Sequence, residues 1–349
     1  MTPRGRIARE IDQHEGWISF ARYMQLALHE PGVGYYAGGA RVFGARGDFV
    51  TAPELGSLFG RTLARELAQF PAILEIGAGS GALAETLTAA LDCEYSILET
   101  SGELRQRQAA RLPGVKFLDE APSRFRGAII ANEVVDAMPV HVVHWTAQGI
   151  LERGVNRAFA WEDRPANGAL LETASEIAQH IALPAPYVSE ISLQGAAWMR
   201  HLVERLESGA IFVIDYGFPR REYYHPQRAA GTLMCHYQHR THADPFARPG
   251  EEDISAHVDF SALAQAARAA GGEVLGYATL AQFLVNCGIT EVLSEANAEN
   301  ALVYAPIAAQ AQKLLSPAEM GELFKVLAVG RGIEQPLTGF THGDRSASL

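Results

Sequence analysis

A glycine-rich segment after a short apolar run is the feature that most restricts the fold of this chain. Residues 73–76 predict a buried strand, and Gly77, Ala78, Gly79 and Gly81 lie in the turn that leads from it into a predicted helix. Glycines in such a turn let the backbone approach a ligand closely, and the first N–H groups of the helix point at that ligand. The segment therefore predicts a cofactor site at the end of a strand.

Short apolar runs alternate with helical patterns from residue 71 onward. Continuous apolar strands separated by helices are typical of a parallel sheet that is covered on both faces, so we expect an α/β fold. The predicted strands are residues 72–76, 95–98, 115–118, 128–131, 210–214, 273–277 and 325–329, and the predicted helices are residues 81–91, 101–111, 196–206 and 260–270.

The chain has 349 residues, enough for two domains at a prior of about 150 residues each. The predicted strands nevertheless extend from residue 73 to about residue 329, which favours one enlarged domain. We expect a helical N-terminal region at 1–70, a Rossmann-like domain at 71–334 and a flexible tail at 335–349. Insertions are expected at about 141–207, beginning with a strand or hairpin, and at 218–258, whose length suits a lid or binding loop.

The spacing Gly77-x-Gly79-x-x-Ala82 also fits the dinucleotide fingerprint, so the cofactor has to be chosen on other grounds. Glu75 occupies a buried strand position that dinucleotide folds fill with an apolar residue, and a carboxylate there suits a cationic cofactor such as S-adenosylmethionine. Gly81 adds a third glycine to the motif, which begins well inside the chain. These features favour S-adenosylmethionine over a nicotinamide dinucleotide.

Two further carboxylates follow the next two predicted strands. Glu99 ends the second strand, at a distance from Gly77 along the chain where a carboxylate can accept hydrogen bonds from both ribose hydroxyl groups. Asp119 follows the third strand, at a position that could meet the adenine edge. The alternative for each is a solvated loop carboxylate. Together with the glycine motif, the spacing makes both residues candidates for contact with the cofactor.

Asn132, Glu133 and Asp136 follow the fourth predicted strand. Ligands of open α/β sheets bind beyond the carboxyl ends of the strands, so residues 132–136 should line the site of methyl transfer. If the acceptor is a guanidinium group, it stays charged at neutral pH, and carboxylates must bind it, orient it and receive its proton. Glu133 and Asp136 suit that task as a pair. The alternative makes Asp136 a helix N-cap and Glu133 a partner of the helix dipole.

Histidines are dense between residues 218 and 258. His257 is a candidate to orient the substrate or relay a proton, and Asp259 is predicted to cap the helix at 260–270. His236, His239 and His242 recur every third residue, but nearby prolines argue against the helix that a helical metal pair needs. We therefore expect no metal site.

Several short blocks, in their order and spacing, resemble the MidA-like methyltransferases. Each block alone is weak, but together they cover almost the whole chain. Besides the glycine strand, the blocks are residues 31–36 (Pro-Gly-Val-Gly-Tyr-Tyr), 47–54 (Gly-Asp-Phe-Val-Thr-Ala-Pro-Glu), 132–139 (Asn-Glu-Val-Val-Asp-Ala-Met-Pro), 214–217, 253–260 and 324–327.

This family has bacterial and mitochondrial members, among them the complex I assembly factor that methylates an arginine of a respiratory-chain subunit. The resemblance implies a class I methyltransferase fold, with one antiparallel strand in a mostly parallel sheet and an inserted, largely helical substrate module. It also implies S-adenosyl-L-methionine as cofactor, protein arginine N-methylation, and a respiratory complex I subunit or similar protein as partner.

The same resemblance implies that the loop at residues 47–54 folds over the cofactor. Asp48, Thr51, Pro53 and Glu54 are therefore further site candidates. Thr51 and Glu54 also have the spacing of a capping box at the start of a helix. The two roles are compatible.

Charge and composition exclude other classes of protein. A formal net charge of −11 argues against a dedicated nucleic-acid-binding protein, which needs a basic surface. No apolar run reaches the ~18–20 residues that cross a bilayer, the N-terminus lacks a secretory pattern, and three unpaired cysteines favour a reducing compartment. We expect a cytoplasmic protein without membrane insertion, and a homodimer is compatible with the sequence. Methylation of a small molecule and a non-catalytic assembly chaperone stay as alternative functions.

Overall fold

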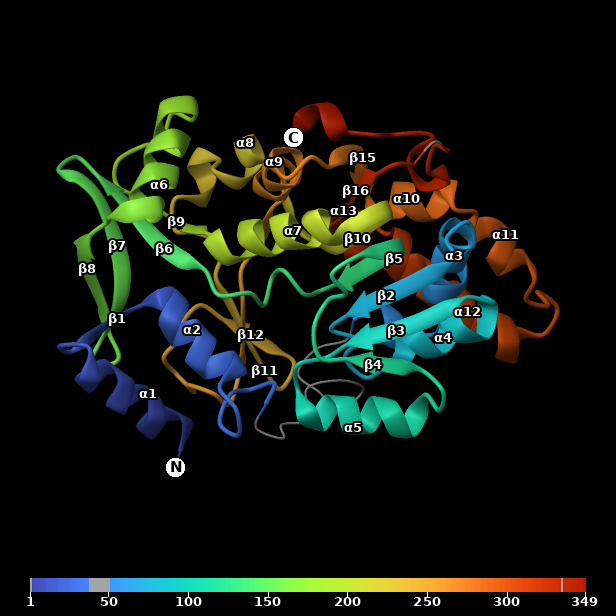
Figure 1. Ribbon diagram of the computed structural model, residues 1–349, viewed down its shortest axis with the longest axis horizontal. Coiled ribbons are helices and arrows are strands. Elements are labelled where there is room, and N and C mark those ends of the chain that lie inside the picture. Colours follow the sequence, from blue (N-terminus) through green and yellow to red (C-terminus); the bar gives the residue numbers. More distant parts are fainter. Residues whose placement is uncertain (1, 38–50, 334) are drawn as a thin grey trace.

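The computed structural model describes residues 2–37, 51–333 and 335–349, which form a large mixed sheet and a smaller antiparallel sheet beside it (Figure 1). The large sheet confirms the expected α/β fold. Strand β16 is antiparallel to both of its neighbours, and the other strand pairs are parallel. In spatial order its strands are β15 (Glu273–Thr279), β16 (Phe324–Arg331), β10 (Leu206–Phe218), β5 (Phe125–Asn132), β2 (Ala72–Ile76), β3 (Glu94–Leu98) and β4 (Lys116–Leu118), and β14 (Val258–Asp259) pairs with β10.

Both faces of the large sheet are covered by helices, which explains why its central strands β2 and β5 are mostly apolar. Ile73 and Leu74 are adjacent in β2 and point to opposite faces, and both are fully buried. Ile73 packs with α3 (Ser57–Leu67), α4 (Ala82–Ala90) and α10 (Leu280–Asn286). Leu74 packs with α7 (Leu193–Arg205) and α9 (Phe260–Ala269). The other helices of this part are α5 (Gly102–Arg111), α11 (Ile289–Ser294), α12 (Ala301–Leu315) and α13 (Met320–Leu323).

The smaller sheet corrects the expectation of a largely helical inserted module. Residues 141–191 contribute four strands and one helix, and the N-terminal region adds a strand that pairs with β7. Helices α1 (Pro3–Gln13) and α2 (Phe20–His29) share a core with one face of this sheet, and α6 (Gly168–His180) shares one with the other. The strands are β1 (Trp17–Ser19), β6 (His141–Thr146), β7 (Gly149–Asn156), β8 (Trp161–Pro165) and β9 (Tyr187–Ile191).

The second insertion, which looked irregular in the sequence, contains a three-stranded antiparallel sheet in the order β12-β11-β13. Each strand has only three or four residues, too few to produce a clear period. Its elements are α8 (Arg220–Tyr223), β11 (Met234–Tyr237), β12 (Arg240–His242) and β13 (Asp253–Ser255).

Residues 335–349 pack against the protein and do not form the flexible tail that the sequence suggested. Leu337 and Phe340 are buried in the core beneath the large sheet. The backbone N–H of Gly339 donates to Glu66 Oε2 at 2.7 Å. Two apolar side chains and this hydrogen bond are enough to anchor a segment whose composition is otherwise polar. Among the described residues, no helix combines the length and apolar character that crossing a membrane requires.

Candidate functional site

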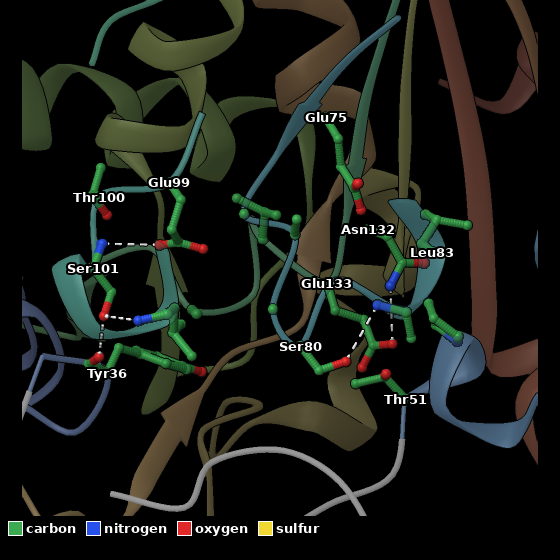
Figure 2. A pocket seen from close by; sticks show the side chains of 18 of the residues that line it. Tyr36, Thr51, Glu75, Ser80, Leu83, Glu99, Thr100, Ser101, Asn132 and Glu133 are labelled. Atoms are coloured by element: carbon green, nitrogen blue, oxygen red, sulfur yellow. Dashed lines mark hydrogen bonds between the residues drawn. The ribbon is translucent and has the colours of Figure 1, made fainter. Parts of the chain in front are cut away.

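The candidate residues meet in one cavity at the carboxyl ends of β2, β3 and β5 (Figure 2). These strands are parallel, so their carboxyl ends lie at the same edge of the sheet and bring the candidate residues close together. Asp48 lies outside the described residues. The sequence-predicted residues that line the cavity are Thr51, Pro53, Glu54, Glu75, Gly77, Ala78, Gly79, Glu99, Asn132, Glu133 and Asp136.

The glycine turn after β2 adopts backbone conformations that other residues rarely take. The φ angles of Gly77, Gly79 and Gly81 are 66°, 55° and 82°. A Cβ atom on Gly77 would lie 3.0 Å from Val134 Cγ2, so a side chain there would press on the loop after β5. Gly81 does not line the cavity and instead precedes the first residue of α4. The turn thus brings bare backbone to the cavity wall.

Glu99 is held rigidly at the end of β3 and is only 8% exposed. Its Oε1 accepts a hydrogen bond from the Ser101 N–H at 2.9 Å, and its Oε2 accepts one from Gln108 Nε2 at 3.0 Å. Gln108 Nε2 also donates to the carbonyl oxygen of Gly79 at 2.8 Å, which ties Glu99 to the glycine turn. Burial raises the pKa of the Glu99 carboxyl. This geometry supports the predicted position of Glu99.

Glu75 lies at the back of the cavity, as the sequence predicted, and is 3% exposed. The Tyr95 hydroxyl donates to its Oε2 at 2.7 Å. Burial raises the pKa of Glu75 to about 7, against the opposing effect of this hydrogen bond. A cationic ligand group would favour the charged form of such a carboxyl.

Asp119 is not brought to the cavity, contrary to the predicted adenine contact. Strand β4 ends at Leu118, and the Asp119 side chain turns outward and is 89% exposed. It forms an ion pair with Arg105 of helix α5. The structure therefore favours the solvated carboxylate that the sequence left as the alternative.

The segment before α3 closes over the glycine turn. Residues Ala52–Leu55 form a short 3₁₀ helix, and the Ser80 hydroxyl of the turn donates to Glu54 Oε1. Within the described part of the chain, Thr51 makes no side-chain cap hydrogen bond, so the predicted capping box does not form. The backbone N–H of Ala52 hydrogen-bonds the Glu133 carboxyl. Thr51 to Glu54 thus connect the cofactor motif with the acidic loop.

The acidic loop after β5 lies wholly within the described residues and contains no helix, which removes the helix-cap alternative for Asp136. Glu133 has a φ of 52°, a left-handed conformation that is strained for a residue with a side chain. Its N–H donates to the carbonyl of Ile214 at 2.9 Å, and Asn132 Nδ2 donates to Glu133 Oε1 at 3.2 Å. The strained backbone is thereby held so that Glu133 lines the cavity (Figure 2).

Four acidic side chains gather around this loop. The charged groups that act on Glu133 are Asp136 and Asp253, and those that act on Asp215 are Asp136 and Glu133. Burial and this mutual repulsion raise the pKa of Glu133 to about 8, and burial raises that of Asp136 to about 6. Burial raises the pKa of Asp215 well above its usual range. The cluster is therefore poised to bind a cation or to receive a proton.

His29 and Tyr36, which the sequence did not single out, also line this end of the cavity. Tyr36 donates from its hydroxyl group to Asp253 Oδ1 at 2.7 Å, and its ring stacks on His29. His29 Nε2 lies 3.0 Å from the carbonyl oxygen of Ala137. Tyr36 and Asp253 both lie in the short sequence blocks described above, which was the available signal. The hydrogen bond between Tyr36 and Asp253 connects the N-terminal region with the second insertion, two segments that are far apart in the sequence.

His257 does not line the cofactor cavity. It borders a second cavity, of about 520 Å³, between α6, α7, α8 and α9. Its ring packs against the rings of Tyr216 and Phe218, and its buried Nδ1 has no hydrogen-bond partner among the described residues. Burial, with help from Arg228 and Lys325, lowers the pKa of His257 to about 4, so the ring is neutral at pH 7. A direct role in the transfer site is not supported by this position.

The histidine triplet of the sequence does not converge. His242 instead meets Cys235 and Glu252, whose possible ligand atoms all lie within 4.8 Å of one another. His242 Nε2 is 3.0 Å from Glu252 Oε2, while the Asp244 N–H donates to His242 Nδ1. A ring that accepts at Nδ1 carries its proton at Nε2, so His242 donates a hydrogen bond to Glu252 Oε2.

Comparisons with known proteins agree with this site. Residues 58–278 match a family model described as "Putative S-adenosyl-L-methionine-dependent methyltransferase". The chain belongs to this methyltransferase family. A COG1565 superfamily protein from Burkholderia thailandensis, crystallised with S-adenosyl-homocysteine, shares 47% identity and a TM-score of 0.94 over 99% of this chain and 96% of its own.

More distant relatives cover nearly the whole chain as well. The protein named "Protein arginine methyltransferase NDUFAF7 homolog, mitochondrial" from Drosophila melanogaster is 27% identical over 93% of this chain and 86% of its own. The human protein named "Protein arginine methyltransferase NDUFAF7, mitochondrial" is 26% identical over 90% of this chain and 80% of its own.

The cavity fits S-adenosyl-L-methionine, the cofactor of this family. Gly77 and Gly79 line the cavity with bare backbone, and Glu75 and Glu99 supply carboxylates at two strand ends. The buried Asn132 Oδ1 and Asp136 Oδ1 have no hydrogen-bond partner in the described part of the chain. Acceptor atoms left open in this way suit a ligand that carries positive charge and N–H or O–H donors.

Glu99→Gln should weaken the binding of S-adenosylhomocysteine at least about 10-fold, because hydrogen bonds to a charged acceptor are worth about 1.5–3 kcal/mol. Isothermal titration calorimetry measures the affinity. Glu94→Gln, at an exposed position of the same strand, is the matched control. Equal affinities for the two variants would show that Glu99 does not contact the cofactor.

Glu133→Gln should stabilise the protein increasingly as the pH rises. The folded-state pKa of Glu133 is raised to about 8, so unfolding releases its proton between about pH 4.5 and pH 8, and stability falls across that window. Since one pKa unit corresponds to about 1.4 kcal/mol, the stability difference between variant and wild type should grow by at least about 1 kcal/mol from pH 5 to pH 8. Urea unfolding measures it, with exposed Glu120→Gln as control. A constant difference would contradict the raised pKa.

Proposed function

We propose that this protein is an S-adenosyl-L-methionine-dependent protein-arginine N-methyltransferase, with a respiratory complex I subunit or a similar protein as its partner. The observation that carries the proposal is the acidic cluster in which Glu133 and Asp136 line the cofactor cavity and the buried Asp215 and Asp253 act on them. The names of the relatives from fly and human support arginine as the acceptor. The family resemblance of the sequence supports the partner.

The acceptor chemistry follows from the geometry of the carboxyl groups. A guanidinium group carries its charge in a planar array of N–H donors and keeps it at neutral pH. Glu133 lines the cavity, and Asp136 presents a buried Oδ1 that has no hydrogen-bond partner among the described residues. Entry of a guanidinium would stabilise the charged forms of both groups. We assign Glu133 and Asp136 to binding and orienting the acceptor, with Asn132 holding Glu133 in place.

Methyl transfer needs orientation and the removal of one proton. The cofactor, when bound, supplies an activated methyl group, whose carbon–sulfur bond breaks as a carbon–nitrogen bond to the acceptor forms. The guanidinium nitrogen then releases a proton, and we assign its uptake to Asp136 Oδ1. A base works best when its pKa lies near the working pH, and burial has raised the pKa of Asp136 to about 6. Glu75, Glu99 and the glycine turn would hold the cofactor meanwhile.

The test is transfer of a labelled methyl group to protein. The purified chain is incubated with S-adenosyl-L-methionine, tritiated on its methyl group, and a lysate of the organism that encodes it. We expect at least one labelled protein band. A labelled small molecule without a labelled protein would favour small-molecule methylation. No label at all, despite measured binding of S-adenosylhomocysteine, would favour a chaperone without catalysis.

A further inference from the structure

Tyr216, near the end of β10, contacts Asp136, the carboxylate to which we assign uptake of the proton. Its hydroxyl group donates to Asp136 Oδ2 at 2.5 Å. The Tyr216 ring is held edge-on between His257, at a centroid distance of 5.3 Å, and Phe324, at 5.5 Å. The side chain therefore has one position, and its hydroxyl group has a defined target.

The preceding residue of the same strand holds the backbone of the acidic loop. Asp215 is fully buried, and its Oδ2 accepts hydrogen bonds from the N–H groups of Val135 at 3.0 Å and Asp136 at 3.2 Å. Its Oδ1 accepts one from the Tyr216 N–H at 2.9 Å. Asp215 thus fixes the backbone at Asp136 while Tyr216 fixes the side chain.

With the backbone and Oδ2 of Asp136 held in this way, its second carboxylate oxygen, Oδ1, is left for a ligand. Oδ2 is engaged by Tyr216. Oδ1 is buried and meets no donor in hydrogen-bond geometry within residues 2–37, 51–333 and 335–349, although the backbone N–H groups of Asp136 and Ala137 are near enough to favour the charged carboxylate. Leaving a buried acceptor unsatisfied costs free energy, so such an atom in a cavity wall points to a ligand that supplies a donor. The orientation of Asp136, rather than its presence alone, is what this arrangement secures.

We propose that Tyr216 is a positioning residue for methyl transfer, which holds Asp136 Oδ2 so that Oδ1 faces the acceptor nitrogen and takes its proton. This inference rests on the proposed function and extends it to a residue outside the cofactor cavity. It requires that removal of one hydroxyl group affects the transfer step and leaves cofactor binding unchanged.

The groups around Asp136 determine how loss of the Tyr216 hydroxyl group would change the pH dependence of methyl transfer. Asp136 faces Glu133 from its own loop, Asp215 and Tyr216 from β10, and the Tyr36 hydroxyl, while His257 lies behind Tyr216. Burial raises the pKa of Asp136, and the Tyr216 hydrogen bond opposes that rise most strongly, followed by the backbone N–H groups of Ala137 and Asp136. Without the hydroxyl group the pKa of Asp136 moves further up, so the active, ionised form requires a higher pH.

The experiment compares Tyr216→Phe with the wild type in the labelling assay between pH 6 and pH 9. We expect labelling to fall about fivefold at pH 6 and to recover towards the wild-type rate at pH 9, since a rise of one unit from a pKa of about 6 lowers the ionised fraction at pH 6 from about a half to about a tenth. The affinity for S-adenosylhomocysteine should stay within about twofold, which also shows that the variant is folded. Tyr277→Phe, which removes a buried hydroxyl group without a hydrogen-bond partner among the described residues, should match the wild type at every pH.

Two results would overturn the inference. An unchanged pH profile in Tyr216→Phe would show that the hydroxyl group does not act on the reacting carboxylate. An equal loss at every pH, accompanied by weaker cofactor binding, would show a merely structural role. If the wild type labels no protein at any pH, the proposed function itself fails, and that outcome is separate from both.

Discussion

Asp136→Asn is expected to lower methyl transfer at least about 100-fold, because a positioned general base typically contributes 10²- to 10⁴-fold to a rate. The amide keeps the size of the carboxyl group and can still accept the Tyr216 hydrogen bond at one oxygen. It can neither carry a negative charge nor take the acceptor's proton. The initial rate of label transfer at pH 8 measures the effect, and the affinity for S-adenosylhomocysteine should stay within a few-fold.

Asp119→Asn is the matched control for this substitution. Asp119 is exposed, forms an ion pair with Arg105 and does not line the cavity. Its variant should retain transfer within about twofold, because exposed ion pairs contribute little. Transfer by Asp136→Asn at the wild-type rate would remove Asp136 from the reaction. A large loss of methyl transfer in Asp119→Asn would instead support the predicted contact between Asp119 and the adenine.

Gly79→Arg is expected to weaken S-adenosylhomocysteine binding at least about 100-fold, equivalent to about 2.7 kcal/mol. Gly79 lines the cofactor cavity and has a φ of 55°, so arginine there adds backbone strain and places a long cationic side chain where the ligand would lie. Calorimetry with S-adenosylhomocysteine measures the loss, and methyl transfer should disappear with it.

Gly114→Arg is the control that separates the effect of backbone strain from that of a side chain filling the cofactor cavity. Gly114 also has a positive φ, of 96°, but a Cβ atom there would meet none of the described residues within 4 Å, and it does not line the cofactor cavity. We expect Gly114→Arg to lose some stability and to bind S-adenosylhomocysteine normally. If both variants bound equally well, the cavity at the glycine turn would not be the cofactor site.

The parts of the fold that the sequence predicted are those set by local pattern. The central strands of the large sheet are mostly apolar because both faces of the sheet are buried there. The three glycines of the turn after β2 indicate its left-handed backbone. Glu75, Glu99 and Glu133 could be placed because each stands at or beside the end of such a strand. The rule that ligands bind at the carboxyl ends of parallel strands then brought them together.

The parts that the sequence did not predict depend on contacts between distant segments. Strand β1, in the N-terminal region, pairs with β7 of the first insertion, and Tyr36 meets Asp253 of the second. Neither pairing leaves a periodic signal in one sequence. Asp119 is the opposite case, since its spacing fits the pattern but its side chain is exposed, pairs with Arg105 and does not line the cavity.

The residue that receives the methyl group distinguishes arginine methylation from every other methyl transfer to protein. The labelled protein from the lysate reaction, made with a cofactor whose methyl group is deuterated, can be digested and examined by tandem mass spectrometry. We expect the heavy methyl group on an arginine side-chain nitrogen, and we expect it to be absent when Asp136→Asn replaces the wild type. A heavy methyl group on lysine, on a carboxyl group or on the N-terminal amine would show that the protein is not an arginine methyltransferase.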